Sequence, residues 1–147
     1  MPIGRLSLAA AMILSMGIDP QAATAAPAAV EKVYWAQTVG DRIRRADLDG
    51  LNVETLLTTP LLDDATALAI DPIARKVYWA QTQPLGGRIL RADFDGRNDE
   101  IVVDWPLVDT PVALAVDPAG GKVYWAESFD PRIVRADLTG LNIQPLL

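Results

Sequence analysis

The stretch EKVYWAQT at residues 31–38 decides the fold, because near copies return as RKVYWAQT at 75–82 and GKVYWAES at 121–128. A second landmark follows each copy: RIRRADLDG begins at residue 42, RILRADFDG at 88 and RIVRADLTG at 132. The glycines that close this landmark are Gly50, Gly96 and Gly140. Self-similarity at a fixed period of 44–46 residues indicates a repeat architecture, interrupted once by the insert QPLGG at 83–87.

Each unit is expected to form four short strands. ALAID at 67–71 is the first strand and ends at an Asp-Pro, since proline cannot donate to a strand ladder. KVYWAQ is the second, RIRRADL is the third with an Asp-Gly reversal after it, and VETLL is the fourth. Along the second strand both alternating sets of side chains are apolar, which indicates a sheet stacked between two others. The expected fold class is therefore all-β, with four-stranded units stacked as propeller blades.

The order ALAIDP, KVYW, RIxRADLDG and NVETLL resembles the YWTD (class B) repeat of the low-density lipoprotein receptor family, over residues 30–147. The resemblance implies half of a six-bladed ring, with blades at about 30–60, 61–106 and 107–147. It also implies protein ligands bound across one rim. One departure is that Ala-Gln, Ala-Gln and Ala-Glu stand where the family has Thr-Asp. Gln37 and Gln81 are expected to replace part of the aspartate's hydrogen bonding as acceptors.

Composition excludes several function classes. The 147 residues carry a net charge of −6, which argues against nonspecific binding to nucleic acid or anionic lipid. The absence of cysteine and the short chain favour a bacterial protein that shares the repeat. The absence of histidine removes the usual general base and the commonest transition-metal ligand. We therefore expect no catalytic residues, no metal site and no cofactor.

The first 25 residues admit two interpretations. Arg5, the apolar run LSLAAAMILSMGI and the ATA ending at Ala25 resemble a signal peptide with a secreted or periplasmic product, and the run is too short to span a membrane. Alternatively, MGIDP at residues 16–20 echoes LAIDP and is a displaced first strand of the first blade. In the first interpretation the three blades occupy residues 26–147.

Three blades do not close a ring, since propellers have four to eight. The open faces indicate either a homodimer that completes six blades or a fragment of a longer propeller protein.

Four repeated constellations favour structural roles. The Tyr-Trp pairs are predicted to be core residues. The ADLDGLN and ADFDGRND turns lack the full calcium-loop pattern and favour hairpin reversals. Arg45, Arg91 and Arg135 are interpreted as polar pairs with the aspartates two residues later, and the aspartates before proline are expected to cap turns. The structural repeat positions are Tyr34, Trp35, Tyr78, Trp79, Tyr124, Trp125, Asp71, Asp117, Gly50, Gly96 and Gly140.

Binding is expected on the rim made by the loops from strand two to three and from strand four to the next blade, where the repeat breaks down. Trp105 stands where the preceding unit has Thr59, although it could instead cover a seam between blades. The rim candidates are Trp105, Glu127, Phe129, Asp130, Arg132, Arg88, Asp41 and Arg42. Exposed aromatic side chains beside charged ones resemble interface anchors.

The sequence thus predicts an exported, noncatalytic propeller module that binds protein or serves as a scaffold. The alternative from another class is a calcium-dependent, lactonase-like propeller hydrolase.

Overall fold

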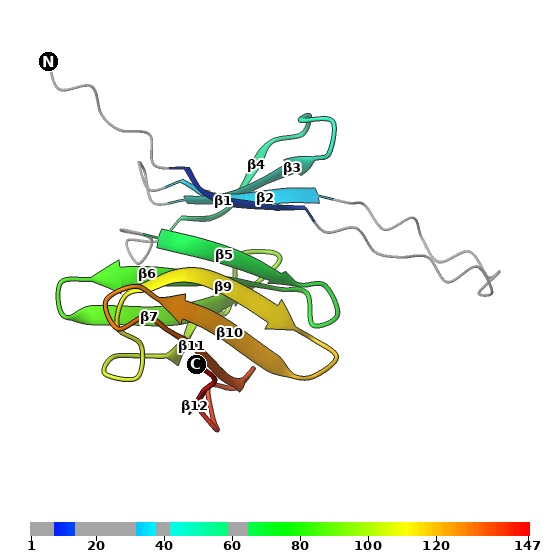
Figure 1. The fold of residues 1–147 in the computed structure, drawn as a ribbon. Coiled ribbons are helices and arrows are strands. Elements are labelled where there is room, and N and C mark those ends of the chain that lie inside the picture. The colour runs from blue at the N-terminus through cyan, green and yellow to red at the C-terminus, as the bar shows by residue number, and fades with distance from the viewer. Residues whose placement is uncertain (1–7, 14–31, 38–41, 59–64) are drawn as a thin grey trace, which may run out of the picture.

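The computed structural model describes residues 8–13, 32–37, 42–58 and 65–147, with only the backbone of 8–13. This part of the chain is all-β, contains no helix and forms three antiparallel sheets of four strands each (Figure 1). The first sheet contains β1 (Leu8–Ile13), β2 (Lys32–Gln37), β3 (Arg42–Asp47) and β4 (Glu54–Thr58). The second contains β5 (Ala65–Asp71), β6 (Lys76–Gln83), β7 (Gly86–Asp93) and β8 (Glu100–Val103). The third contains β9 (Pro111–Asp117), β10 (Lys122–Glu127), β11 (Arg132–Asp137) and β12 (Gln144–Pro145).

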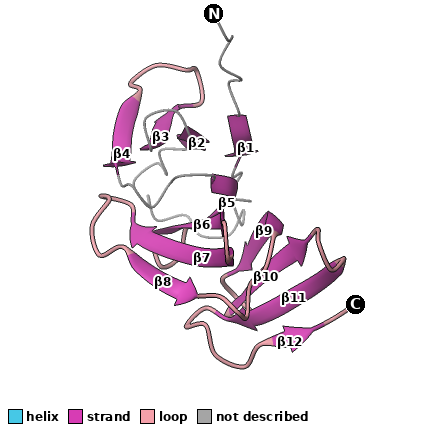
Figure 2. Cartoon of the chain, turned by 90° about the vertical axis from the view of Figure 1, so that its left-hand side faces the viewer, coloured by secondary structure: helices cyan, strands magenta, loops and turns pink. Residues whose placement is uncertain are grey.

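Each sheet is a simple meander in which strands pair in chain order. The first strands β1, β5 and β9 lie beside one another, while β4, β8 and β12 lie at the far edges, so the sheets fan out (Figure 2). This is the arrangement of consecutive propeller blades, and we call the three sheets the first, second and third blades. The predicted fold class, a propeller segment of three four-stranded blades, is confirmed.

Two apolar clusters hold the blades together, one at each junction. The first joins Tyr34, Ala36 and Ile43 of the first blade to Val77, Trp79 and Leu90 of the second. The second joins Ala69, Tyr78 and Ile89 of the second blade to Val123, Trp125 and Val134 of the third. We call the face of a blade toward the next blade its back face, and the face toward the preceding blade its front face. The tyrosine of each Tyr-Trp pair thus lies on the back face and the tryptophan on the front face.

Among the described residues, the second blade alone is covered on both faces, and its pair is buried, with Tyr78 1% and Trp79 0% exposed. In the outer blades only one member of each pair is buried: Tyr34 in the first and Trp125 in the third. Trp35 and Tyr124 are partly exposed. The expectation that both faces are buried therefore holds for one described blade of three.

The N-terminal segment is described only in part. Leu8–Ile13 pairs antiparallel with β2, with Ile13 opposite Val33. This strand lies within the run interpreted as a signal peptide, while residues 16–20, the alternative first strand, lie outside the described residues. The signal peptide and the division at residue 25 stay predictions.

Candidate protein-binding rim

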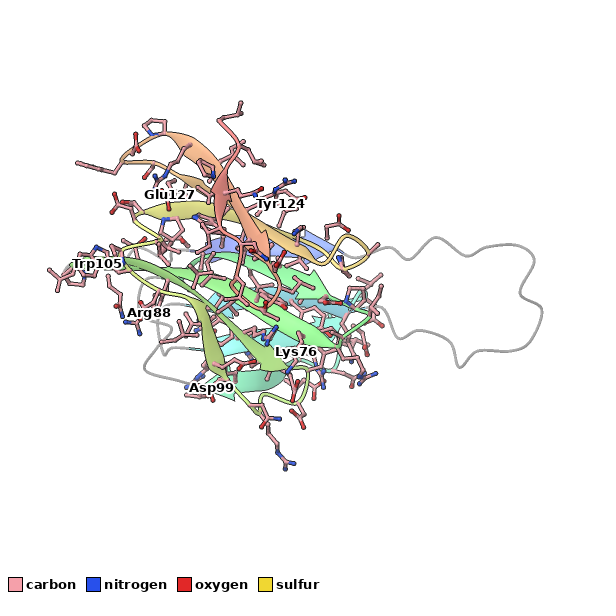
Figure 3. All side chains as sticks on the ribbon, turned by 90° about the horizontal axis from the view of Figure 1, so that it is seen from below. Lys76, Arg88, Asp99, Trp105, Tyr124 and Glu127 are labelled. Carbon is pink, nitrogen blue, oxygen red and sulfur yellow. The ribbon has the colours of Figure 1, made fainter. Side chains whose placement is uncertain are left out.

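Three connections form one rim of the second and third blades: the β6–β7 hairpin, the β8–β9 loop at 104–110 and the β10–β11 turn at 128–131. Backbone hydrogen bonds join them, from Gly87 N to Val108 O at 3.1 Å and from Ser128 N to Thr110 O at 3.0 Å. Arg88, Trp105 and Glu127 lie on the same side of the molecule (Figure 3). The sequence-predicted candidates from these two blades are thereby brought together.

Two aromatic side chains are exposed on this rim, with Trp105 at 59% and Phe129 at 82%. The indole of Trp105 lies against Gly86, since a Cβ built on that glycine would come within 2.0 Å of the indole Cδ1. Gly86 belongs to the hairpin of the same blade, so this contact is not a seam between blades. The missing side chain of Gly86 lets the Cδ1 edge of the indole lie close to the hairpin backbone, while the residue stays 59% exposed.

Glu127 is a correction to the predicted set of contact residues, because its side chain is buried, with the residue only 4% exposed. Its carboxylate accepts hydrogen bonds from Trp125 Nε1 (2.9 Å), the backbone N–H of Asp109 (3.0 Å) and Arg132 Nε (2.6 Å). Burial alone would raise the pKa of Glu127, but these donors outweigh it and hold the pKa below its ordinary value. Glu127 therefore supports the rim from beneath and does not reach a partner.

Two arginines connect this support to the surface. Arg132 donates a hydrogen bond to Glu127. Its Nη1 also lies 3.7 Å from Oδ2 of the exposed Asp130. The bond to Glu127 is the main reason that the pKa of Arg132 is raised further above its ordinary value. Arg88 donates to Gln83 Oε1 at 2.6 Å and lies 3.5 Å from Asp104, the residue before Trp105. Both arginines are thus oriented by neighbours before any partner binds.

Of the predicted rim candidates in the first blade, the structure places one. Arg42 is exposed at the start of β3. Asp41 and Thr59 lie outside the described residues, so the structure does not place them.

Gln81 occupies in the second blade the position that Glu127 occupies in the third, opposite Arg88 in the β6–β7 ladder as Glu127 is opposite Arg132. Its Oε1 is buried without a hydrogen-bond partner, and so are the neighbouring Trp79 Nε1 and Arg88 Nε. The expectation that Gln81 replaces the family's aspartate as an acceptor is therefore wrong at this oxygen. Three buried polar atoms thus lack hydrogen bonds around the neutral amide, whereas the carboxylate of Glu127 serves three donors.

The turns after the third strands, Asp-Gly in two blades and Thr-Gly in the third, each begin at an aspartate whose carboxylate has internal partners. In each blade the aspartate that ends the third strand contacts a lysine and accepts from an asparagine side chain five residues later. The lysine is the first cause, and the asparagine the second, of the lowered pKa of Asp47, Asp93 and Asp137. Among the described residues no group of three or more His, Cys, Asp or Glu side chains could hold a metal ion.

The interpretation that Arg45, Arg91 and Arg135 pair with the aspartates two residues later needs correction. Arg45 Nε donates instead to Glu54 at 2.7 Å, and Arg91 Nε to Glu100 at 2.7 Å. Their Nη1 atoms reach the next blade, at Phe94 O (2.9 Å) and Leu138 O (2.8 Å). Since the ladder brings the fourth strand beside the third, the nearest opposite charge lies across the strands and not along one.

The aspartates before proline lie at the β5–β6 and β9–β10 turns. Asp71 Oδ1 accepts from the backbone N–H groups of Ile73 and Ala74, at 2.9 and 2.8 Å, and Asp117 Oδ1 from that of Gly120 at 2.9 Å. These are the bonds of carboxylate-capped turns.

Sequence reasoning missed three groups of residues. The lysines and asparagines around the repeated aspartates recur at constant positions, so the repeat itself carried that signal. The reach of Arg45 and Arg91 to the following blade had no local signal, because the carbonyl acceptors lie 49 and 47 residues away. Asp109 acts through its backbone, which no side-chain pattern reveals.

The three stacked four-stranded sheets, with connecting loops gathered at one end, define part of a β-propeller. No protein-family model matches the chain, and no curated protein matches its sequence. Solved structures do match. A chain in the crystal structure of a nidogen/laminin complex is similar at 28% identity and a TM-score of 0.72, over 81% of this chain and 44% of that one.

Two further structures share the fold alone. Virginiamycin B lyase from Staphylococcus aureus aligns with a TM-score of 0.60 at 15% identity, over 79% of this chain and 37% of that one. A putative TolB from Agrobacterium tumefaciens aligns with a TM-score of 0.60 at 20% identity, over 80% and 44%. The present chain thus spans less than half the length of each of these propellers.

The described residues include no helix long and apolar enough to cross a membrane.

Proposed function

We propose that the chain is a noncatalytic propeller module of the YWTD type that binds a protein ligand through the rim around Trp105 and Phe129. The observation that carries this proposal is the pair of exposed aromatic side chains, Trp105 and Phe129, on a rim that the buried Glu127 stabilises from inside. Large exposed apolar side chains are costly to leave in water, and next to oriented arginines they are typical of interface anchors. The similarity to a chain of the nidogen/laminin complex supports protein binding by this architecture.

The chemistry of the rim indicates the kind of ligand. Trp105 and Phe129 offer flat apolar surface, while Arg132 and Arg88 offer donors beside the acidic Asp130 and Asp104. We expect a protein surface with an apolar side chain flanked by charged groups of both signs. Arg42 extends the rim toward the first blade. Export from a bacterial cell, through residues 1–25, is part of the proposal and agrees with the signal-peptide pattern.

The test compares the native chain with the double variant Trp105→Ala/Phe129→Ala. Each is immobilised and exposed to a protein extract of the organism that makes the chain, and the retained proteins are measured. Ligands retained by the native chain are expected to fall at least about tenfold with the double variant, as for loss of two anchor residues. Ile73→Ala/Leu141→Ala is the matched control, because both side chains are exposed, at 72% and 65%, in turns away from this rim. Equal capture by the native chain and the rim variant rejects the proposal.

Folding must be checked separately, and the exposure of Trp105 predicts the result. Trp105→Ala is expected to change the free energy of unfolding by less than about 1 kcal/mol, as for a surface position. A loss of several kcal/mol would show that the indole is a structural cover of its hairpin. Thermal and denaturant unfolding of the single variant measure this directly.

The alternative, a calcium-dependent hydrolase, makes a different prediction. Such an enzyme would lose thermal stability on chelation, because a metal that binds only the native state stabilises it. We expect no shift in Tm between EDTA and millimolar calcium. A shift of several degrees favours the enzyme.

A further inference from the structure

The back face of the third blade carries the same side chains as back faces that are buried elsewhere in the molecule. In the second blade this face consists of two alanines of β5, Tyr78, Ala80 and Ile89, and all of them are 0–4% exposed. The corresponding set in the third blade is Ala113, Ala115, Tyr124, Ala126 and Ile133. Ile133 is 39% exposed, Ala113 and Ala115 are exposed, and Tyr124 and Ala126 are half-buried. A surface built for burial is therefore uncovered by the described residues.

The two internal junctions show what covers such a face. The next blade lays the turn after its third strand across it, and an arginine of the back face donates to a carbonyl of that turn. The glycine of the turn then touches the fourth strand: a Cβ on Gly96 would lie 1.9 Å from Leu56 O, and one on Gly140 1.9 Å from Val102 O. Each junction thus repeats one arginine bond and one glycine contact.

In the third blade the arginine of this set is Arg135. Its Nε and Nη2 donate hydrogen bonds to Gln144 Oε1 at 3.3 and 3.0 Å. Gln144 occupies the position that Glu54 and Glu100 occupy in the other blades. Nη1 is the atom that reaches the next blade in Arg45 and Arg91, and in Arg135 it makes no hydrogen bond with the described residues. The back face therefore presents a donor as well as apolar surface.

The complementary front face lies on the first blade of the same chain. Leu48 takes the position of Phe94 and Leu138 and is 49% exposed. Gly50 has φ +82°, like Gly96 and Gly140, yet a Cβ there would meet nothing within 4 Å. Trp35 is partly exposed, whereas Trp79 and Trp125 are 0% and 1% exposed. One chain therefore offers both halves of the junction that it makes twice internally.

We infer that two copies of this chain associate back face to front face, with the third blade of each against the first blade of the other. Arg135 Nη1 of one copy donates to Leu48 O of the other, and Gly50 lies against the backbone at Leu146. The same contact made twice closes under a two-fold axis, and six blades lie within the range that propellers adopt. This inference is independent of the rim, which lies at the ends of the strands.

One residue limits the strength of this association. Arg44 stands on the front face of the first blade where Leu90 and Val134 stand in the others, and its guanidinium lies 5.7 Å from the centre of the Trp35 ring. Covering this face would take a charge out of water, which costs free energy unless the charge is paired. We therefore expect the association of the two chains to be reversible, with a dissociation constant that depends on the residue at position 44.

The experiment is sedimentation or light scattering of the full chain over a dilution series. The native chain is expected to show the mass of two chains at high concentration and of one on dilution. Ala126→Arg places a long charged side chain on the back face and gives single chains, while Leu85→Arg, at a hairpin position 82% exposed, leaves the dimer unchanged. Arg44→Leu lowers the dissociation constant by about tenfold or more, since it removes the cost of burying a charge.

Arg135→Ala is the second back-face variant, which keeps the test usable if Ala126→Arg fails to fold by circular dichroism. It removes the crossing hydrogen bond and is expected to weaken the dimer. The inference is overturned if the native chain has the mass of one chain at every concentration, as expected when the face is meant for further blades of the same polypeptide. It is also overturned by a dimer that both back-face variants leave intact, or by open-ended polymers in place of a closed pair.

Discussion

Glu127 and Gln81 occupy the same position in neighbouring blades, and the difference of one atom decides whether a buried polar group is satisfied. The carboxylate of Glu127 binds an indole N–H, a backbone N–H and a guanidinium. Around Gln81 the corresponding indole Nε1 and guanidinium Nε are buried without hydrogen bonds, and the guanidinium Nε has only the more distant Asp104 Oδ1, at 3.5 Å. An unmade hydrogen bond on a buried group costs about 1–3 kcal/mol. The second blade thus tolerates a penalty that the third avoids.

Exchanging the two side chains tests this account. Glu127→Gln is expected to lower the free energy of unfolding at pH 7 by about 1–3 kcal/mol, because it leaves at least one donor unpaired. Gln81→Glu is expected to raise it by about 1 kcal/mol, because a second oxygen becomes available to Trp79 and Arg88. Urea unfolding of both variants measures the two changes. The account fails if both substitutions act in the same direction.

The pH dependence of these variants follows from the lowered pKa of Glu127. A carboxyl whose pKa is lower in the folded state stabilises the protein fully above its unfolded pKa, and loses that contribution as pH falls through the folded pKa. The advantage of the native chain over Glu127→Gln should therefore be constant near neutrality and shrink below about pH 4–5, the ordinary range of a glutamate. A difference that does not change with acid would place the effect in packing.

At the scale of the elements, the turn after each third strand is the part that joins one blade to the one before it. A Cβ added to Gly96 or Gly140 would lie 1.9 Å from a carbonyl oxygen in the fourth strand of the preceding blade. A Cβ added to Gly50 would have no atom within 4 Å. All three have φ between +78° and +82°, so the backbone strain of adding a side chain is the same. The three glycines therefore form a matched set in which only the junction differs.

Gly96→Ala is expected to destabilise the chain by about 1–3 kcal/mol more than Gly50→Ala, the usual cost of overpacking. Both variants are compared in the Ala126→Arg background, so that association at Gly50 does not contribute. Equal losses for the two substitutions would mean that the first and second blades are not packed as the structure has them.

Most of these elements could be predicted from the sequence. The repeat located every second and third strand, because KVYW and RIxRAD combine strand-forming residues with turn signals at fixed offsets. Alternation identified two apolar faces on each second strand, and both are buried in the second blade. What could not be predicted was which face each outer blade leaves open, since Tyr34 and Tyr124 have the same local sequence and differ only in what stacks on them. The burial of Glu127 had a similar cause, because two of its three donors come from a loop 18 residues away and from the neighbouring strand, and only Trp125 lies on its own strand.

At the scale of the whole molecule, the two apolar clusters of the described residues join the blades in a linear order, the first to the second and the second to the third. In such arrays stability is a sum of unit and junction contributions, and the ends open first. The second blade takes part in two junctions and each outer blade in one. Its strands should therefore be the last to open.

Amide hydrogen exchange followed by mass spectrometry tests this stacking most directly, at a concentration where the chain has the mass of one copy. The account predicts slower exchange for peptides from β6 and β7 than for the equivalent peptides from β2, β3, β10 and β11. The sequences of these strands are nearly identical, so intrinsic exchange rates differ little. Exchange in β6 as fast as in both β2 and β10 would contradict the claim that the second blade is held between the other two.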